Sequence, residues 1–370
     1  MKKILVLGTG APQLDLIKEC KARGLDVFAC SYRSGDIAEQ FVDFFAPINI
    51  TNVDDVKKYA KENNIDYIYS VGSDIAMPTA FKVSEDLALP HFCSSKTANI
   101  CNHKALLRDV LGNEYGWNLV HQRVTTLDDS LSMDFPFIMK PTDSQGQRGV
   151  FLIHNRKEYE ELFAQSLSFS REKAIILEEY VYGDEISINT FSSNGKIVFF
   201  LVSDRIAWKE FPGGIIHRHI IPSKYENNDK VIFQLRDLAR TTLEKLKISN
   251  GPAYFQVIIS PGGKPNLIEV SPRLDGCHMW RLIKYATGVD LLALTIDGLI
   301  GGFPKKYIDY DVVPFEIEFL CQSSEEVLKK EFFHIIKPYK YLQWYYREGD
   351  KPRKMNGYME KCGYVIRKTN

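Results

Sequence analysis

Several features that mark specialised classes of protein are missing from this 370-residue sequence. Its 47 Lys and Arg residues balance 47 Asp and Glu residues, so the basic excess typical of nucleic-acid-binding proteins is absent. No apolar run approaches the roughly 20 residues that a membrane-spanning helix needs. The N-terminal stretch Ile4–Gly8 is too short for a secretory signal and predicts a buried strand. We therefore expect no nucleic-acid or membrane partner.

The cysteines do not show the spacing of a metal site or of a disulfide framework. The seven cysteines are scattered, odd in number and contain no CxxC pair. This pattern predicts free thiols in a reducing cytoplasm rather than disulfides or a zinc site. Repeats and low-complexity segments are also absent, and the length predicts two or three domains.

The first hundred residues alternate between apolar strands and helices. We expect strands at 4–7, 27–30 and 67–71, and helices at 14–23, 53–62 and 76–85. Strands that alternate with helices form βαβ units around a parallel sheet. Residues 1–100 therefore predict a Rossmann-like domain in an α/β protein.

A glycine turn, Gly8–Gly10, follows the first strand, where dinucleotide-binding domains hold a pyrophosphate. The third glycine of that fingerprint is replaced by Gln13, and the second strand ends at Cys30 without an acidic residue for the ribose. An NAD-dependent oxidoreductase is thus an alternative that the sequence disfavours.

The rest of the chain predicts three further units, at residues 101–170, 171–310 and 311–370. We expect helices at 102–111, 157–165 and 231–246, and strands at 137–140, 150–154, 175–177, 186–191, 197–201, 254–259 and 267–270. The last unit is rich in aromatic residues and closes with a strand at 363–366. Aromatic clusters of this kind more often pack against a core or a dimer partner than stack on a ligand.

The first element with chemical meaning is a strand that ends in Lys140, followed by a glycine-containing loop from Ser144 to Val150. Backbone N–H groups of such a loop can cover phosphates while Lys140 and Arg148 neutralise their charge. The second element, Glu178–Val181, ends another strand, and its backbone suits the edge of a purine. The alternatives are a surface hairpin and a solvated acidic strand end.

The third element is a predicted hairpin around Gly262 and Gly263. A two-residue turn at these glycines places Gln256 opposite Glu269, with Ser271 and Arg273 on the same face. Carboxylate, amide and hydroxyl oxygens gathered in this way suit Mg²⁺. A cross-strand Gln–Glu hydrogen bond is the simpler alternative.

The order and spacing of these elements resemble the ATP-grasp superfamily, in the branch of carboxylate–amine ligases that includes carbamoyl phosphate synthetase large-subunit halves. The resemblance covers about residues 1–310 and implies a Rossmann-like domain followed by a two-lobed ATP-grasp domain, with residues 101–170 as the small lobe, 171–310 as the large lobe and 311–370 as strands completing the large lobe.

The resemblance also implies roles for individual residues. ATP would be held by residues of the small lobe and of the strand after it: Lys104, Lys140, Ser144, Gly146, Gln147, Gly149, Glu178, Glu179, Tyr180, Val181 and Glu185. Mg²⁺, or Mn²⁺ as an alternative ion, would be held by Gln256, Glu269 and Ser271. Arg273, Lys140 and Arg148 would be catalytic. The implied reaction activates a carboxylate as an acyl-phosphate and joins it to an amine.

Two positions depart from the family pattern. Gln256 stands where an acid is common, and Ser271 stands where Asn is usual. These neutral ligands keep open a second hypothesis, a nucleotide-binding regulatory protein without ligase turnover. Five further residues are candidates for substrate contact: Arg205, His217, Arg218, His278 and Arg281. The expected partners are a small carboxylate and a small amine, and the family is compatible with a homodimer.

Overall fold

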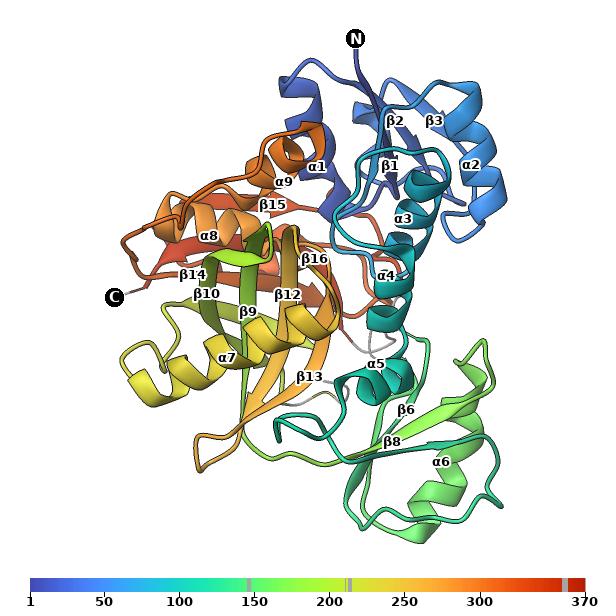
Figure 1. The fold of residues 1–370 in the computed structure, drawn as a ribbon. Coiled ribbons are helices and arrows are strands. Elements are labelled where there is room, and N and C mark those ends of the chain that lie inside the picture. Colours follow the sequence, from blue (N-terminus) through green and yellow to red (C-terminus); the bar gives the residue numbers. More distant parts are fainter. Residues whose placement is uncertain (145–147, 210, 212–214, 355–358, 370) are drawn as a thin grey trace.

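The computed structural model describes residues 1–144, 148–209, 211, 215–354 and 359–369. These residues build three sheets, with the N-terminal sheet at the top of Figure 1, the largest in the centre and the small lobe at the bottom. Within the described residues, no helix is both long and apolar enough to cross a membrane. The predicted mixed α/β fold is confirmed.

The N-terminal sheet is parallel, with strand order β3-β2-β1-β4. Its strands are β1 (Lys3–Leu7), β2 (Asp26–Cys30), β3 (Phe44–Ala46) and β4 (Tyr67–Tyr69); the helices are α1 (Ala11–Ala22), α2 (Val53–Glu62) and α3 (Ala76–Asp86), with a short 3-10 turn at Glu39–Phe41. Leu5 and Val6 point to opposite faces and are both fully buried, because helices cover both sides of the sheet. The helices and strands expected in residues 1–95 are therefore confirmed, and β3 is additional.

The prediction of one helix over residues 102–111 is wrong at its N-terminal end. Two helices meet there, α4 (Ser95–Asn102) and α5 (Lys104–Leu111). His103 between them has an extended backbone, and its Nδ1 accepts a hydrogen bond from the N–H of Leu106 at 3.2 Å. A side chain that caps the second helix in this way ends the first one. Lys104 is therefore the first residue of a helix.

The small lobe is a four-stranded antiparallel sheet in the order β5-β8-β6-β7, covered by α6. Its elements are β5 (His121–Val124), β6 (Phe137–Pro141), β7 (Phe151–Ile153), α6 (Arg156–Ser168) and β8 (Ile175–Glu179). Grouping the strand at 175–177 with the large lobe is wrong, since β8 lies between β5 and β6. Its apolar run predicts a buried strand but carries no information about which sheet buries it.

The large sheet has eight strands in the order β13-β12-β9-β10-β11-β14-β16-β15. They are β9 (Asp184–Ser193), β10 (Lys196–Ala207), β11 (Ile216–Ile221), β12 (Gly251–Ile259), β13 (Pro265–Ser271), β14 (Phe315–Gln322), β15 (Tyr341–Trp344) and β16 (Glu360–Lys368), with a 3-10 turn at Lys330–Phe332. The expected β9–β10 hairpin is confirmed, with Ser193 paired to Lys196. The C-terminal strands join this sheet, and the unit boundaries other than the one at residue 170 remain predictions.

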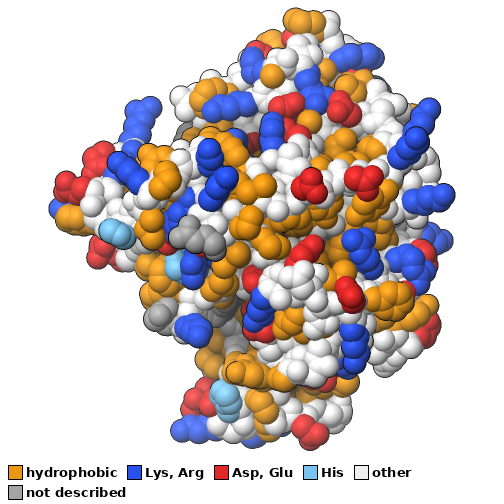
Figure 2. Space-filling model, turned by 90° about the vertical axis from the view of Figure 1, so that its left-hand side faces the viewer, with side chains coloured by type: hydrophobic (Ala, Val, Ile, Leu, Met, Phe, Trp, Pro, Cys, Tyr) orange, Lys and Arg blue, Asp and Glu red, His pale blue; other side chains and the backbone are white. Residues whose placement is uncertain are grey.

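Helices α7 (Asp229–Lys245) and α8 (Met279–Thr287) pack on opposite faces of the large sheet, because Arg236 of α7 lies over the ring of Phe200 and Tyr285 of α8 stacks on Phe315. Helix α9 (Leu291–Ile300) contacts α8 and β12. Phe255 and Val257 of β12 share a core with Leu235 of α7 and Ile296 of α9. Since side chains alternate along a strand, Tyr254 and Gln256 point to the other face. On the outside, positive and negative side chains are interspersed over the face shown in Figure 2.

Candidate active site

The face of the large sheet that points away from α7 carries a row of polar side chains. Glu269 of β13 pairs with Gln256 of β12, Gln256 with Ser187 of β9, and Ser187 with Ser203 of β10. Directly paired residues share a face of the sheet. Ser187 and Ser203 are fully buried, and their hydroxyls find no hydrogen-bond partner among the described residues. Buried polar groups without partners indicate that something else completes the site.

The pairing of Gln256 with Glu269 is confirmed, although the turn assumed for it is wrong. Gly263 N–H donates to Ser260 at 2.7 Å, so the loop contains Pro261, Gly262 and Gly263 rather than two glycines. Proline suits the second position of such a turn, and Gly263 adopts a positive φ of 80° at its end. This longer loop shifts the register by one residue.

A β-bulge in β13 restores the register. Val257 pairs with Leu267, whereas Gln256 pairs with Glu269, so Ile268 is the extra residue. Arg108 of α5 fixes the bulge, because its guanidinium donates to the carbonyls of Leu267 and Ile268 at 2.8 Å each. The predicted neighbours therefore meet through two departures that cancel.

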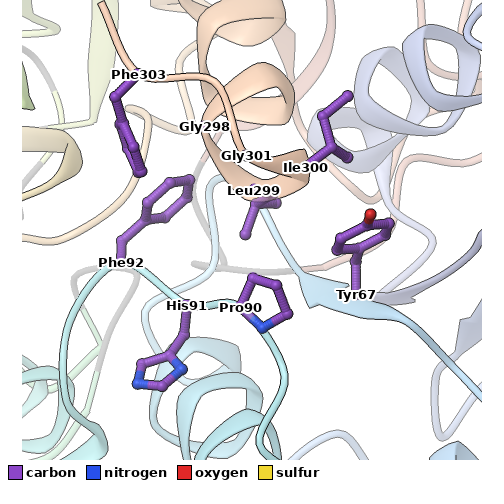
Figure 3. Close-up of a pocket in the computed structure, with 9 residues that line it drawn as sticks. All are labelled: Tyr67, Pro90, His91, Phe92, Gly298, Leu299, Ile300, Gly301 and Phe303. Carbon is purple, nitrogen blue, oxygen red and sulfur yellow. The ribbon is translucent and has the colours of Figure 1, made fainter.

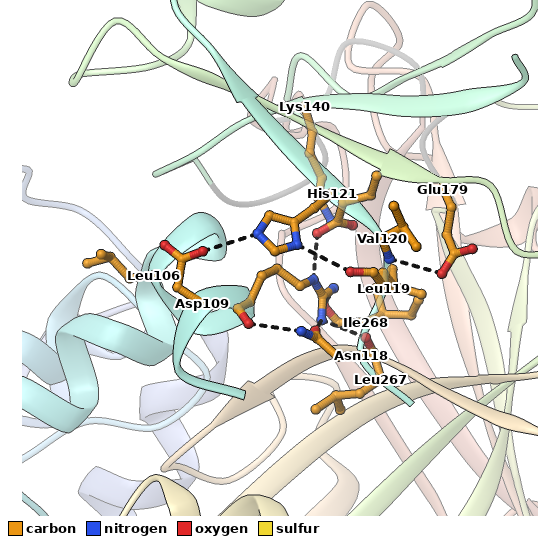
Figure 4. Close-up of polar contacts among 12 residues, drawn as sticks. Leu106, Asp109, Asn118, Leu119, Val120, His121, Lys140, Glu179, Leu267 and Ile268 are labelled. Atoms are coloured by element: carbon orange, nitrogen blue, oxygen red, sulfur yellow. Dashed lines mark hydrogen bonds and ion pairs between the residues drawn. The ribbon is translucent and has the colours of Figure 1, made fainter. Parts of the chain in front are cut away.

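Arg108 also belongs to a cluster of cations, of which Figure 4 labels Lys140, near Asn118, Leu267 and Ile268. Its Nε lies 2.8 Å from one oxygen of Glu178, and Lys140 Nζ lies 2.5 Å from the other. Lys104 is nearby, and its Nζ donates to the carbonyl of Ser144 at 2.5 Å. Two cations thus contact one carboxylate, and Lys104 is close enough to Lys140 to affect its pKa. Sequence reasoning found both lysines but missed Arg108, which lies one helical turn after Lys104.

Charge balance in this cluster favours an anionic ligand. Burial would raise the pKa of Glu178, but Arg108 and Lys140 outweigh it and lower the pKa to about 2. Burial lowers the pKa of Lys140, and Arg108 and Lys104 add to this effect against the attraction of Glu178. Cations that crowd one another in this way are relieved by phosphate oxygens.

Asp74, in the segment between β4 and α3, is a site residue that the sequence did not reveal. Ser271 Oγ donates to it at 2.5 Å, and Arg273 contacts it through Nε at 2.7 Å and Nη2 at 2.5 Å. Arg273 holds the pKa of Asp74 below its usual value, although burial acts in the opposite direction. The N-terminal domain thus supplies a carboxylate to the end of β13, and no motif around Asp74 signals this.

Glu269 contrasts with Asp74. None of the described residues contributes a hydrogen bond or ion pair to its carboxylate. Burial and the negative charge of Asp74 raise the pKa of Glu269, while Lys104, Arg273 and Lys140 act against this rise. Lys104, Lys140, Asp74 and Arg273 are therefore all close enough to Glu269 to influence it. The two lobes and the N-terminal domain converge on this carboxylate.

Part of the predicted phosphate loop is described. Gly146 and Gln147 lie outside the described residues, and Arg148 is exposed. Gly149 has a φ of 71°, and a Cβ there would lie 2.8 Å from the ring of Phe169. Ser166 also donates to its carbonyl at 2.8 Å. The loop is thus anchored at Gly149 and contacted by Lys104 at Ser144.

The predicted adenine and ribose residues lie at the end of β8 and the start of β9. The N–H of Glu179 donates to the carbonyl of Val120, and the Glu179 carboxylate accepts from the Val120 N–H, each at 3.0 Å. Tyr180 is 41% exposed. The Glu185 carboxylate pairs with Arg205 and accepts from Gln256 Nε2 at 3.3 Å. Glu185 and Arg205 therefore lie beside the polar row.

The remaining substrate candidates have partners within the chain. His217 lies 3.2 Å from Glu318 and stacks on Trp208, while Arg218 lies 3.3 Å from Glu316. His219, the next residue, was not singled out, yet it is fully buried. Burial and Arg205 hold the pKa of His219 well below its usual range.

His278 and Arg281 bind a carboxylate, but it is that of Asp15 in α1. Arg281 Nη2 lies 2.5 Å from Asp15, His278 Nδ1 lies 3.4 Å from it, and Trp280 Nε1 donates to it at 3.0 Å. His278 Nε2 also lies 2.8 Å from the hydroxyl of Tyr345. These contacts join α1, α8 and the aromatic C-terminal segment, as expected if that segment packs a core.

The side chain of Gln13 occupies the glycine turn after β1. Gln13 Oε1 accepts from the N–H of Gly10 at 3.0 Å, and its amide donates to the carbonyl of Val71 at 2.5 Å. A pyrophosphate at this turn would have to displace Gln13. The structure thus adds a physical reason against an NAD site.

A pocket of about 270 Å³ lies away from these residues, between the N-terminal domain and α9 (Figure 3). Phe92, Phe303 and Leu299 give it a mainly apolar lining, and Tyr67 and His91 lie at its margin. It contains none of the predicted site residues. The polar row, the cation cluster and Asp74 therefore define the candidate active site.

Comparison with known proteins identifies the fold that carries this site. The sequence pattern of the ATP-grasp domain family matches residues 133–280. A formate-dependent phosphoribosylglycinamide formyltransferase from Prochlorococcus marinus is 26% identical over 76% of this chain and 73% of its own length. A D-alanine–D-alanine ligase from Petrotoga mobilis is 27% identical over 38% of this chain and 45% of its own length. For several other relatives the match covers only about half of the relative's own length, which is 53% in one case.

Solved structures agree over the whole chain. An L-amino acid ligase from Bacillus licheniformis has a TM-score of 0.81 at 19% identity and covers 99% of this chain and 93% of its own. N5-carboxyaminoimidazole synthetase from Staphylococcus aureus, complexed with ADP, has a TM-score of 0.76 at 16% identity and covers 100% and 93%. At these identities the likeness shows the fold. Together with the family match, it shows that residues 133–280 form an ATP-grasp domain in a chain that has the fold of these enzymes.

Proposed function

We propose that this protein uses Mg-ATP to activate a small carboxylate as an acyl-phosphate and then joins it to a small amine. One observation carries the proposal: Glu269, an acid without a partner among the described residues, lies where Lys104, Lys140, Asp74 and Arg273 converge. Phosphoryl transfer depends mainly on positioning and on neutralising charge, and this arrangement supplies groups for both.

The residues fit both ATP and a divalent ion. Arg108, Lys140 and Lys104 together carry more positive charge than Glu178 neutralises, which leaves charge for phosphates. Burial and the negative charge of Asp74 raise the pKa of Glu269, and a divalent cation would offset both effects. When bound, Mg-ATP supplies the phosphoryl group that activates the carboxylate, and the metal neutralises charge on it. Mn²⁺ is a suitable substitute because it also takes oxygen ligands.

The nucleotide would lie between the two lobes. Lys104 and Lys140 would bind phosphates under the Ser144–Gly149 loop, with Arg148 reaching them from that loop. We assign Glu178 to holding Lys140 in place, since both of its oxygens are already paired. The N–H of Glu179 is also in use, so the adenine edge falls to the backbone around Tyr180 and Val181. Glu185 would contact the ribose.

The metal and acyl-transfer groups come from the large sheet. Glu269 would hold the ion with Gln256 and Ser271 as neutral oxygen ligands. Asp74 fixes the guanidinium of Arg273 through two contacts, so it is oriented before substrate arrives. A positioned arginine can stabilise the oxyanion that develops when an amine attacks an acyl-phosphate. The amine proton has no assigned acceptor among these residues.

The polar row suggests where the carboxylate substrate binds. Ser187 and Ser203 offer buried hydroxyls next to Gln256, and Arg205 lies beside them. The relatives' names point to different substrates, formate and phosphoribosylglycinamide in one and D-alanine in another, so they support the class of reaction rather than one substrate. We place the protein in the cytoplasm, which its seven free cysteines support. Assembly into a homodimer is part of the proposal.

Calorimetry of ATP binding tests the proposal. Wild type should bind ATP more tightly with Mg²⁺ than without, and Glu269→Gln should lose this dependence on Mg²⁺. Glu160→Gln, which changes an exposed acid on α6, is the matched control and should behave as wild type. A wild type that does not bind ATP would overturn the proposal.

Phosphate release separates the ligase from the regulatory alternative. A panel of carboxylates and amines should include a pair that stimulates release of phosphate from Mg-ATP by wild type but not by Glu269→Gln. Binding that persists without Mg²⁺ and without Glu269, together with no release from any pair, would favour a nucleotide-binding protein without turnover.

A further inference from the structure

A second group of potential metal ligands lies on the same side of the large sheet. It consists of His219 on β11 and of Asp275 and Cys277, both between β13 and α8. One ligand atom from each residue lies within 4.8 Å of the other two. All three side chains are buried, with exposures of 0%, 5% and 6%. Residues about sixty positions apart in sequence therefore bring an imidazole, a carboxylate and a thiol together.

Three polar atoms of this group lack partners among the described residues. Neither ring nitrogen of His219 nor Oδ2 of Asp275 has a hydrogen-bond partner among the described residues. The other oxygen, Oδ1, accepts from the N–H of Cys277 at 3.0 Å, which fixes the carboxylate against the thiol-bearing residue. A buried group without a partner costs about 1–3 kcal/mol, so three such atoms together indicate a missing ligand.

The segment that carries Asp275 and Cys277 is held in place by a close backbone contact. A Cβ on Gly276 would lie 3.0 Å from the Cα of Gly72, and a Cβ on Gly72 would lie 2.7 Å from the Cα of Gly276. Only glycines allow the N-terminal domain and this segment to approach so closely. The two ligands are therefore positioned by the fold, as a preformed site requires.

We propose that His219, Asp275 and Cys277 bind a divalent metal ion of the zinc class, separate from the Mg²⁺ of the ATP site. Nitrogen, sulfur and carboxylate ligands suit zinc, whereas Mg²⁺ requires oxygen ligands throughout. Tetrahedral bonds of about 2.0–2.3 Å place ligand atoms about 3.3–3.8 Å apart, so the side chains must close in by about 1 Å. Three protein ligands leave the fourth position for water or a substrate atom. The site does not depend on the ligase activity.

Neighbouring cations also bear on this assignment. Lys361 Nζ donates to Cys277 Sγ at 3.5 Å, a contact that stabilises a thiolate once the thiol loses its proton to solvent. Arg205, which pairs with His219 across the strands, is itself paired with Glu185. A carboxylate and a thiolate therefore balance the two charges of the ion, while Lys361 remains as a hydrogen-bond donor. The scattered cysteines gave no spacing that could reveal such a site.

Metal content provides the first test. Untagged protein is saturated with zinc, dialysed against metal-free buffer, and analysed by atomic emission. Wild type should retain one zinc ion per chain, as should Cys20→Ala, which removes a buried thiol in α1. Cys277→Ser and Asp275→Asn, which change little in volume, should each lose it. Retention of the zinc by Cys277→Ser would overturn the proposal.

Cobalt distinguishes this site from the Mg²⁺ site. Co²⁺ bound to a thiolate gives a near-ultraviolet charge-transfer absorption that oxygen ligands do not produce. Wild type and Glu269→Gln should both show this absorption, and Cys277→Ser should not. No thiolate absorption in wild type would overturn the proposal, as would one that survives Cys277→Ser. The test stands even if ATP does not bind, because Glu269→Gln leaves all three ligands intact.

A substrate ammonium group is the other ligand that these atoms suggest, and it gives a different result. In that case Asp275→Asn would raise the KM for the amine with kcat little changed, and neither zinc nor cobalt would be retained by wild type. That outcome would reject the metal and assign the cluster to the amine.

Discussion

A buried and a half-buried carboxylate illustrate how acidic residues serve structure in one region and chemistry in another. Asp15 in α1 is 5% exposed and is contacted by Trp280, Arg281 and His278. Burial would raise the pKa of Asp15, but His278 and Arg281 lower it to about 2. Glu269 in β13 receives no such contact from the residues that the structure describes, and burial together with Asp74 raises its pKa. An acid whose oxygens are paired with basic side chains holds structural elements together, whereas an acid without such partners can bind a cation.

The largest effect should follow from removing the satisfied acid. Asp15→Asn leaves Arg281 and His278 without their carboxylate, and breaking a buried ion pair costs about 3–5 kcal/mol. We expect the free energy of unfolding, measured in urea, to fall by about 3 kcal/mol. A loss below about 1 kcal/mol would show that Asp15 does not join α1 to α8.

Removing the unsatisfied acid should damage activity rather than stability. Glu269→Gln should lower kcat by about 100- to 1,000-fold, the range typical when a group that stabilises developing charge is lost. Its free energy of unfolding should equal that of wild type or exceed it, because the charge next to Asp74 is gone. A destabilised variant would mean that Glu269 has a structural partner.

Dependence on pH should have opposite signs at the two sites. Asp15 has a pKa lowered from 3.8 to about 2, so its stabilising contribution of about 2 kcal/mol is present above pH 4 and disappears as the pH falls toward 2. The raised pKa of Glu269 implies a cost at neutral pH that is relieved by protonation. Urea titrations at pH 7, 5 and 3 should therefore show that the difference in free energy of unfolding between wild type and Asp15→Asn becomes smaller at low pH. Any extra stability of Glu269→Gln over wild type should also disappear at low pH.

An exposed acid should show the smallest effect. Glu244 on α7 pairs with Arg240, but their side chains are 56% and 55% exposed. Exposed pairs of this kind contribute about 0.3–0.5 kcal/mol and are screened by salt. Glu244→Gln should therefore lower the melting temperature slightly, and less at 0.5 M salt. A loss as large as that of Asp15→Asn would show that pairing matters without burial.

The sequence predicted the features that are encoded in patterns of neighbouring residues or in the order of motifs along the chain. Strand and helix alternation identified the parallel sheet, and the order of Lys104, Lys140 and Glu269 identified the superfamily. It could not reveal Asp74 or Arg108, because each acts on β13 from a distant segment, and nothing in the neighbouring residues marks that contact. Ser187 and Ser203 are common residues whose importance comes only from their position in the polar row.

The β13 bulge decides which face of the hairpin carries Glu269. With the three-residue loop, regular pairing would place Ile268 opposite Gln256 and Glu269 opposite Phe255, so the carboxylate would point toward α7, since a one-residue shift turns every side chain to the other face. Leaving Ile268 unpaired returns Glu269 to Gln256. A descendant chain that lost Ile268 would keep this pairing, whereas one that kept Ile268 but straightened the bulge would lose Glu269 from the site.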